Sequence, residues 1–279
     1  MTIWAHTLVK NEDKYLWFAV SSVVKYVDKL LLWDTGSTDE TVSICELLKS
    51  TYPKKIDFRR VVQKDIYDFT LTRQQMLEKT SADWLMILDG DEVWWEAGIA
   101  RATQTLSRET NKHLETLVTP YFNIVGDIFH YQEEKAGMYQ IDGQKGHLNI
   151  RFVNMAIPGL HFAKPHGTQG LFDEQGTVVQ ARDKTKRLFV APSGYLHFTN
   201  VTRSTQPDSF VPKRQMKIKY EIGNTFPADF YYPEVFFLPR PDFVPNPWQK
   251  MSTKFFFRSL VESPLRRVKR RIVTSSTGY

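Results

Sequence analysis

The chain has 279 residues, of which 42% are hydrophobic, and contains 14 Gly and 14 Pro. This composition is typical of a folded globular protein and excludes a disordered or low-complexity chain. The net charge of +6 is concentrated at one end: residues 240–279 hold nine Lys and Arg against two acidic residues, so residues 1–239 carry about −1. The basic segment predicts an anionic partner, whereas the nearly neutral remainder does not call for nucleic acid.

The elements of the first 90 residues alternate. Strands are expected at 2–9, 29–33, 55–62 and 84–88, and helices at 12–27, 37–50 and 69–80, the second helix with Ser37 or Thr38 as its cap. Strands that alternate with helices predict a parallel sheet with helices on both faces, a Rossmann-like α/β fold. After residue 114 the segments 116–125, 147–155 and 187–198 read as strands, and 208–221 reads as a helix.

No apolar stretch approaches the roughly 20 residues that span a bilayer. The start, MTIWAHTLVKNE, lacks the basic and then apolar regions of a signal peptide. Cys45 is the only cysteine, which fits a reducing compartment. The expected location is therefore cytoplasmic, with peripheral contact at the inner face of a membrane left open by the basic end.

Two predicted strands run into acidic loops. LLWDTGSTDET (31–41) and DWLMILDGDEVWW (83–95) both pass from apolar residues into carboxylates. Exposed acidic loops are common, but parallel α/β sheets bind ligands at the carboxyl ends of their strands, which is where both loops fall. The two acidic loops therefore predict one shared ligand-binding site.

The second loop has the chemistry of a metal site. Asp89 and Asp91 are two residues apart, and Gly90 between them lets a ligand approach the backbone. Carboxylate oxygens suit Mn²⁺ or Mg²⁺, which can neutralise a diphosphate leaving group. The chain has no GxxxxGK[ST] or GxGxxG segment to bind phosphate in place of a metal.

These segments resemble a known family. LVKNE (8–12), LLWDTGSTDET (31–41) and FTLTRQQMLEKTSADWLMILDGDE (69–92) are similar, in order and spacing, to family 2-type glycosyltransferases of the GT-A fold, in the branch that builds lipopolysaccharide and other surface glycans. The resemblance implies transfer of a sugar from a nucleotide-diphosphate donor, by default a UDP-sugar, to a glycan, lipid-linked or protein acceptor, with inversion. It implies a catalytic domain at 1–205, divided into a nucleotide-sugar half (1–110) and an acceptor half (111–205). A helical, aromatic and basic appendage would follow at 206–279.

The resemblance also assigns residues. Asp34 would contact the nucleobase, Asp39 would close that loop, Asp89 would meet the ribose or a bridging water, and Asp91 would ligate Mn²⁺ or Mg²⁺ and act in catalysis. Arg73 would lie near the nucleotide. The remaining donor-site residues are Leu8, Lys10, Glu12 and Gly90. The alternative to a donor-site role for Arg73 and Glu12 is a surface ion pair, which contributes little energy.

Two histidines match later family segments. His197 in GYLHFTN would complete the metal site, although a histidine in an aromatic strand is also typical of a core. His166 lies where the branch has a His-Glu pair, but Gly167 replaces the Glu. The resemblance therefore does not assign the general base to one residue. His166 is our first candidate, being able to take a proton near neutral pH. The other candidates are Asp127, Glu133, Asp173 and Glu174.

The basic end contains a candidate amphipathic helix in residues 251–273. Ser263 and Pro264 are typical of a helix start, after which Leu265, Val268 and Ile272 share one face among five cations. Such a helix suits an anionic membrane surface. The alternative is a solvated helix or one that docks on the body, for example on the aromatic segment 229–239. No RNA-recognition motif accompanies the charge.

Two other functions remain open. A sugar-nucleotidyltransferase would share the α/β core and the metal, but LVKNEDKY after the first strand is not the Gly-rich loop that it needs. A non-catalytic GT-A-like binding protein at a membrane is favoured by Gly167, and disfavoured by intact Asp34, Asp89 and Asp91.

Overall fold

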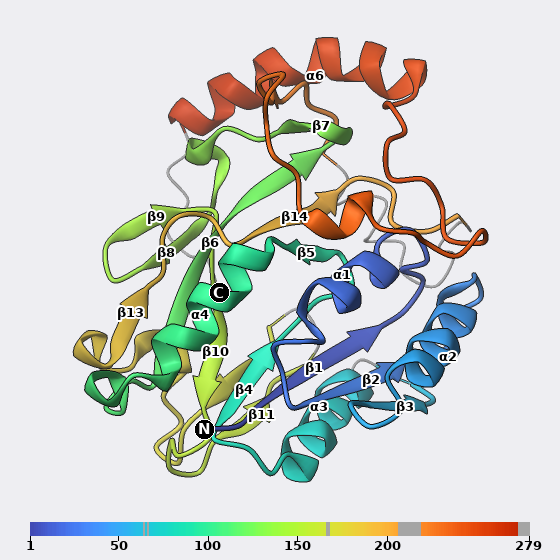
Figure 1. The fold of residues 1–279 in the computed structure, drawn as a ribbon. Helices are drawn as coiled ribbons and strands as arrows, with labels where there is room; N and C mark the ends of the chain where they lie inside the picture. Colours follow the sequence, from blue (N-terminus) through green and yellow to red (C-terminus); the bar gives the residue numbers. More distant parts are fainter. Residues whose placement is uncertain (64, 66, 166–167, 206–218, 273–279) are drawn as a thin grey trace.

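The computed structural model describes residues 1–63, 65, 67–165, 168–205 and 219–272. The first elements are β1 (Ile3–Val9), α1 (Leu16–Val23), β2 (Lys29–Asp34), α2 (Thr41–Thr51), β3 (Ile56–Arg60), α3 (Asp68–Lys79) and β4 (Trp84–Ile87). The four strands pair in parallel in the order β4-β1-β2-β3 (Figure 1). The predicted alternation of strands and helices is confirmed.

Helices cover both faces of this sheet because its strands are apolar on both sides. In β2, Leu30 and Leu32 enter the main core, to which α1 and α2 also contribute. Leu31 and Trp33 point to the opposite face and pack with Met76 of α3. Successive residues of a strand point to opposite faces, so a continuous apolar run is what a doubly covered parallel strand requires.

The second half extends the sheet with strands of mixed direction. Its elements are β5 (Glu92–Trp94), α4 (Glu96–Ser107), η1 (Glu109–Asn111), β6 (Thr116–Val125), β7 (Asp127–Tyr131), η2 (Glu134–Ala136), β8 (Tyr139–Ile141), β9 (Gln144–Gly146), β10 (Leu148–Asn154), β11 (His161–Ala163), β12 (Gly170–Phe172), η3 (Val179–Ala181), η4 (Lys184–Lys186), β13 (Arg187–Phe189), β14 (Tyr195–Asn200), β15 (Asn224–Thr225), η5 (Glu234–Phe237) and α6 (Thr253–Ile272). β10 lies between β4 and β6 and is antiparallel to both. The predicted α/β fold class, a largely parallel sheet with a C-terminal helix, is confirmed.

The segment after residue 219 packs into the main body. Phe226, Val235, Phe236 and Val244 all belong to the main core, and the Phe236 ring lies 4.9 Å from that of Phe18 in α1. The predicted appendage therefore shares the core of the predicted catalytic domain. The predicted helix at 208–221 falls mostly outside the described residues, and its last three residues form no helix.

Two predicted helix starts are wrong. α2 begins at Thr41, and Ser37 instead bonds within the preceding loop, to Asp34. α6 begins at Thr253, ten residues before the predicted Ser263. Pro264 lies inside α6, where it removes one helical N–H. The first turn of α6 contacts the body through Phe255, whose ring centre lies 5.0 Å from that of Tyr220. None of the helices in the described ranges has both the length and the apolar content needed to cross a bilayer.

A buried histidine in β1 is expected to make the fold sensitive to acid. His6 has no exposed surface and lies 2.6 Å from Thr80 Oγ1 through Nε2. Burial, followed by the charge of Arg73, lowers the pKa of His6 to about 3. The unfolded chain, in which histidine has a pKa of about 6.5, therefore binds more protons between those values, and stability falls as pH falls below 6.5.

We predict that this loss reaches about 2 kcal/mol at pH 5 relative to neutral pH. Urea unfolding of the wild type and of His6→Gln between pH 7.5 and 5 measures it. The wild type should lose more free energy of unfolding than the variant over this range. If the free energy of unfolding changed equally with pH in both proteins, the lowered pKa of His6 would be contradicted, since the other titrating groups are common to the two.

Candidate active site

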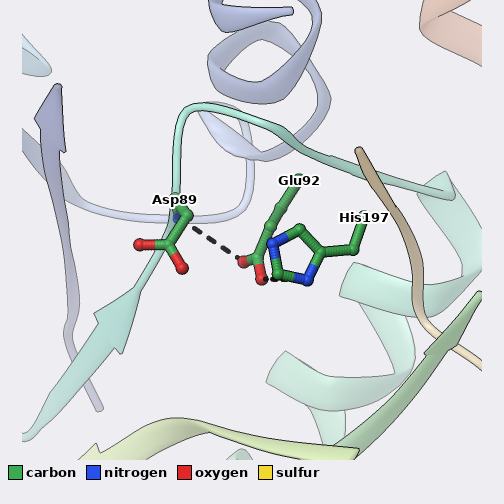
Figure 2. A group of neighbouring side chains, drawn as sticks. All are labelled: Asp89, Glu92 and His197. Carbon is green, nitrogen blue, oxygen red and sulfur yellow. Dashed lines mark hydrogen bonds and ion pairs between the residues drawn. The ribbon is translucent and has the colours of Figure 1, made fainter. Parts of the chain in front are cut away.

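The turn after β4 brings the second acidic loop to the carboxyl end of the sheet. It carries Asp89 and Asp91, and β5 begins at Glu92. β5 pairs with β14 in antiparallel register, with Glu92 opposite His197. The backbone N–H of Phe198 also donates to the Asp91 carbonyl oxygen at 2.9 Å. Strand pairing therefore places a histidine from far along the chain beside the acidic turn (Figure 2).

His197 lies between two carboxylates. Its Nε2 is 3.5 Å from Asp91 Oδ1, and its Nδ1 is 3.7 Å from Glu92 Oε1. One ligand atom each of Asp89, Glu92 and His197 lies within 4.8 Å of the other two (Figure 2). Carboxylate oxygens with one imidazole nitrogen form a donor set that fits Mn²⁺. The predicted pair of Asp91 and His197 is thus brought together, and Glu92 joins them without having been predicted.

Two buried arginines balance Asp89 and Glu92. Arg151 of β10 donates from Nη2 to Asp89 Oδ2 at 2.9 Å and to Glu92 Oε1. Arg73 of α3 donates to Asp89 Oδ1 at 3.5 Å. The Arg73 side chain is buried, so the alternative of a surface ion pair is wrong.

A third arginine connects the acidic turn to the end of β1. Arg203 Nη1 lies 2.9 Å from Asp91 Oδ2 and 3.1 Å from Glu12 Oε1. Glu12 is buried as well, so a surface ion pair is the wrong interpretation for it too. Burial alone would lower the pKa of Arg203, but the charges of Glu12 and Asp91 outweigh it and raise the pKa. The cluster holds four carboxylates and three guanidinium groups.

Burial and neighbouring charges shift the pKa values of Asp89 and Glu92 in opposite directions. Burial is the main cause that raises the pKa of Glu92 to about 7, against the lowering effect of Arg151. Burial would also raise the pKa of Asp89, but the charges of Arg151 and Arg73 outweigh it, and that pKa is lowered. Asp89 therefore stays ionised at neutral pH, as a carboxylate that binds a metal must be.

The first acidic loop is ordered by its own hydrogen bonds. Asp34 is fully buried and accepts the backbone N–H groups of Gly36 at 3.0 Å and Ser37 at 3.1 Å. Asn11, just after β1, donates its N–H to Ser37 Oγ at 2.8 Å and accepts from Thr38 N–H at 2.8 Å. The ends of β1 and β2 are therefore joined. The contact of Asp34 with a nucleobase stays a prediction.

Asp39 occupies the outer part of this loop. Its Oδ1 accepts from Thr41 N–H at 3.0 Å, and its Oδ2 accepts from Ser204 Oγ at 2.5 Å. Ser204 follows Arg203, so the segment after β14 contacts both acidic loops. The contact of Asp39 with a donor also stays a prediction.

A model of glycosyl transferase family 2 matches residues 6–156, more than half of the chain. The chain belongs to glycosyl transferase family 2. The matched residues contain the second half of β1, all elements from α1 to β10, the two acidic loops and the buried Arg73 and Arg151. The predicted resemblance is confirmed.

Curated relatives of this family 2 chain match it over shorter ranges. The SPbeta prophage-derived glycosyltransferase SunS of Bacillus subtilis (strain 168) is 24% identical over 149 residues, which are 51% of this chain and 32% of SunS. A TPR repeat-containing protein of Synechococcus elongatus is 30% identical over 90 residues, 30% of this chain and 19% of its own length. The chain thus spans about a third of SunS and less of the second relative.

Solved structures with a similar fold share little sequence with this family 2 member. S. aureus TarS has a TM-score of 0.46 at 13% identity, over 71% of this chain and 61% of that chain. The mannosyltransferase PcManGT of Pyrobaculum calidifontis, solved with GDP-Man and Mn²⁺, has a TM-score of 0.35 at 17% identity, over 42% and 34% of the two chains. The family assignment therefore rests on the sequence match.

The other predicted donor residues lie around the end of β1. A Cβ atom on Gly90 would come within 3.0 Å of Val9 Cγ1 and 3.3 Å of Glu12 Cβ, so the turn of this family 2 chain needs glycine for close packing of its own loops. Leu8 is buried and packs on the α3 face. Lys10 is half-buried in the loop after β1.

A cavity of about 370 Å³ opens beside the acidic cluster. Among the described residues, its charged lining residues and its one histidine are Arg73, Asp89, Arg151 and His197, and most of the other lining residues are apolar. The apolar lining residues come from β4, β8, β10, β11, β12 and η3, and include Ile141, Leu148, Val153, Phe162 and Leu171. A small-molecule site is typically this combination of apolar walls and a few convergent polar groups.

The candidates for a general base lie outside this cavity or outside the described residues. His166 lies outside the described residues, as does Gly167, which replaces the family Glu. Asp173 pairs with Arg182, and Glu133 pairs with Arg270. Asp127, which bonds His130, and the exposed Glu174 also do not line the cavity. None of these four carboxylates lines the part of the cavity that the described residues form. They are therefore poorly placed to take a proton from an acceptor bound beside Asp89.

Proposed function

We propose that the chain transfers a sugar from a nucleotide-diphosphate sugar, a UDP-sugar by default, to an acceptor nucleophile with inversion. The observation that carries the proposal is the convergence of Asp89, Asp91, Glu92 and His197 beside a cavity at the carboxyl end of a parallel sheet. Family 2 membership supports the same activity. The acceptor would be a glycan, a lipid-linked group or a protein.

The donor would bind between the two acidic loops. We assign Asp34 and Asp39 to the nucleoside side and Asp89 to the ribose, since Glu12 contacts both loops. Its N–H donates to Thr41 Oγ1 at 2.8 Å, and its side chain lies against Gly90 of the β4 turn. Arg73 would lie near the nucleotide, and its buried Nη1 has no hydrogen-bond partner among the described residues. Leu8, Lys10 and Gly90 would shape the floor of this site.

We assign Asp91 and His197 to a bound Mn²⁺ or Mg²⁺, with Asp89 and Glu92 beside them. An imidazole nitrogen in the donor set favours Mn²⁺, because Mg²⁺ prefers oxygen ligands alone. Such an ion supplies a positive charge that stabilises the departing diphosphate. The side chains of Arg151 and Arg203 hold the carboxylates in place.

His166 is proposed as the base that takes the acceptor proton, on the basis of its place in the family segment. Its neighbours in sequence, Phe162 and Gln169, line the cavity that would hold the acceptor. We also propose peripheral contact with a membrane through residues 251–273. No nucleic acid is proposed as a partner.

Mn²⁺ affinity provides a direct test of the metal assignment. His197→Ala should weaken Mn²⁺ binding at least about tenfold, because it removes a ligand from an otherwise intact cluster. Titration calorimetry measures the affinity without any donor or acceptor. The exposed His113→Ala is the matched control and should bind Mn²⁺ like the wild type. Equal affinity for both variants would place the ion elsewhere.

Release of nucleotide diphosphate from a panel of UDP-, GDP- and dTDP-sugars separates the proposed functions. The transferase is expected to hydrolyse one donor slowly with Mn²⁺ and not with EDTA. A non-catalytic binding protein would bind a donor without releasing its diphosphate. A sugar-nucleotidyltransferase would instead form a nucleotide sugar from a sugar phosphate and a nucleoside triphosphate.

A further inference from the structure

Helix α6 is held on the body by polar contacts at its start and along its inner face. It lies along one edge of the molecule, over β7 (Figure 1). Before its first turn, the Met251 N–H donates to Asp127 Oδ2 at 2.9 Å. Further along, Arg266 Nε donates to the Tyr220 carbonyl oxygen at 3.2 Å, and Arg270 pairs with Glu221. These bonds fix the rotation of the helix about its own axis.

The amphipathic pattern of α6 is inverted relative to a helix that packs on a core. Ser259 and Ser263 are buried, and Ser263 accepts from the Ile222 N–H at 2.7 Å. The apolar side chains face solvent, being between 42% and 69% exposed: Phe256, Phe257, Leu260, Val261, Leu265 and Val268. Most of them recur at spacings of three and four residues, so they form one stripe along the outer face. We call this set the outer stripe.

Cations flank the outer stripe on both sides. At 100° per residue, Lys254, Arg258 and Lys269 fall along one edge of the stripe and Arg267 along the other. All four side chains are exposed. Arg258 is held by Glu262 at 2.6 Å and lies 3.7 Å from the centre of the Tyr220 ring. The surface is therefore apolar at its centre and positively charged at its margins.

We propose that α6 is an interfacial helix that binds an anionic lipid bilayer. The outer stripe would enter the boundary between headgroups and acyl chains, and the flanking cations would meet lipid phosphates. Charge complementarity selects this occupant, because a second copy of α6 would bring its own cations against the same margins. A nucleic acid would leave the central apolar residues without a partner. The inference stands apart from the transferase activity.

Pro264 is exposed on the same face of α6 as the outer stripe and fits a helix that rests at the interface. Proline has no N–H, so the Leu260 carbonyl on the same outer face cannot accept the usual helical hydrogen bond from residue 264. An unpaired carbonyl is costly in the hydrocarbon core of a bilayer. At headgroup depth it can accept from water.

Co-sedimentation of the full chain with vesicles tests the proposal. Binding to phosphatidylcholine vesicles with about a third phosphatidylglycerol should be at least about tenfold tighter than to phosphatidylcholine alone. Charge reversal by Arg267→Glu with Lys269→Glu should weaken it at least about tenfold. Val261→Asp with Leu265→Asp should abolish it. The matched control is Lys112→Glu with Lys184→Glu, which reverses two exposed lysines away from α6.

A fluorescent probe reports on the outer stripe itself. Cys45 is fully buried, so Leu265→Cys and the control Lys112→Cys can each be labelled at the introduced cysteine. Anionic vesicles are expected to shift the fluorescence emission of the label to shorter wavelength at position 265 and not at position 112. The proposal is overturned if the wild type ignores anionic vesicles, or if the α6 variants bind them like the wild type. It is also overturned if sedimentation velocity shows a dimer that Val261→Asp with Leu265→Asp dissociates while vesicles do not bind.

Discussion

Asp91→Asn is expected to reduce nucleotide diphosphate release by at least about a hundredfold, since stabilising the charge of a leaving diphosphate is worth several kcal/mol. The Asp91 carboxylate is 1% exposed and lies 3.5 Å from His197 Nε2. Asn keeps the size of the side chain and an oxygen that can accept from Arg203. The variant therefore removes the negative charge with little change in packing. Steady-state release from the preferred donor measures the effect.

The exposed Asp242→Asn is the control and should release diphosphate at the wild-type rate. Thermal unfolding of both variants shows whether Asp91→Asn has kept the fold. A folded Asp91→Asn protein with wild-type turnover would remove Asp91 from the catalytic site.

Arg151→Met should lower the free energy of unfolding by about 3–5 kcal/mol, the usual loss when one partner of a buried ion pair is removed. Arg151 is the guanidinium that contacts Glu92, which has no exposed surface. Without Arg151, the Glu92 carboxylate is either buried as a charge or protonated. An acid whose folded-state pKa is raised loses stability as pH rises through that value, so the effect of Arg151→Met should grow above neutral pH.

Urea unfolding of three variants isolates this cause. Arg258→Met breaks the solvent-exposed pair with Glu262 and should cost about 1 kcal/mol or less. Glu92→Gln combined with Arg151→Met should recover part of the stability that Arg151→Met loses. If the double variant were as unstable as Arg151→Met alone, lost packing around Arg151 would explain the effect and the buried charge would not.

The parallel sheet was predictable because its physics is local. Leu30 to Leu32 form an apolar run, and a strand covered on both faces needs such a run. The place of the acidic loops follows from the same pattern, since parallel strands end at one edge of a sheet. The pattern of strands could therefore place the two acidic loops at one site, whereas Arg73 was assigned only through the family resemblance.

The remaining site residues depend on strand pairing that a local pattern does not contain. Glu92 meets His197 because β5 pairs with β14, and nothing in either segment specifies that register. Arg151 had a weak signal, as a lone cation in the apolar segment HLNIRFVNM. Arg203 had none, since NVTRS reads as an ordinary polar loop.

The start of α6 was predicted too late because local capping signals were weighed without tertiary contacts. Ser263 and Pro264 are typical of a helix start, yet Ser263 is buried and bonds Ile222 from inside the helix. The outward direction of Leu265 and Val268 agrees with the predicted apolar face. The side chain of Ile272 lies outside the described set.

Calorimetric titration of UDP-, GDP- and dTDP-sugars, in Mn²⁺ and in EDTA, tests whether the two acidic loops form a metal-dependent donor site. One donor is predicted to bind with Mn²⁺ and to lose that binding in EDTA. Asp91→Asn should reproduce the loss with Mn²⁺ present. Failure of every donor to bind in Mn²⁺, with the chain folded, would contradict the donor site.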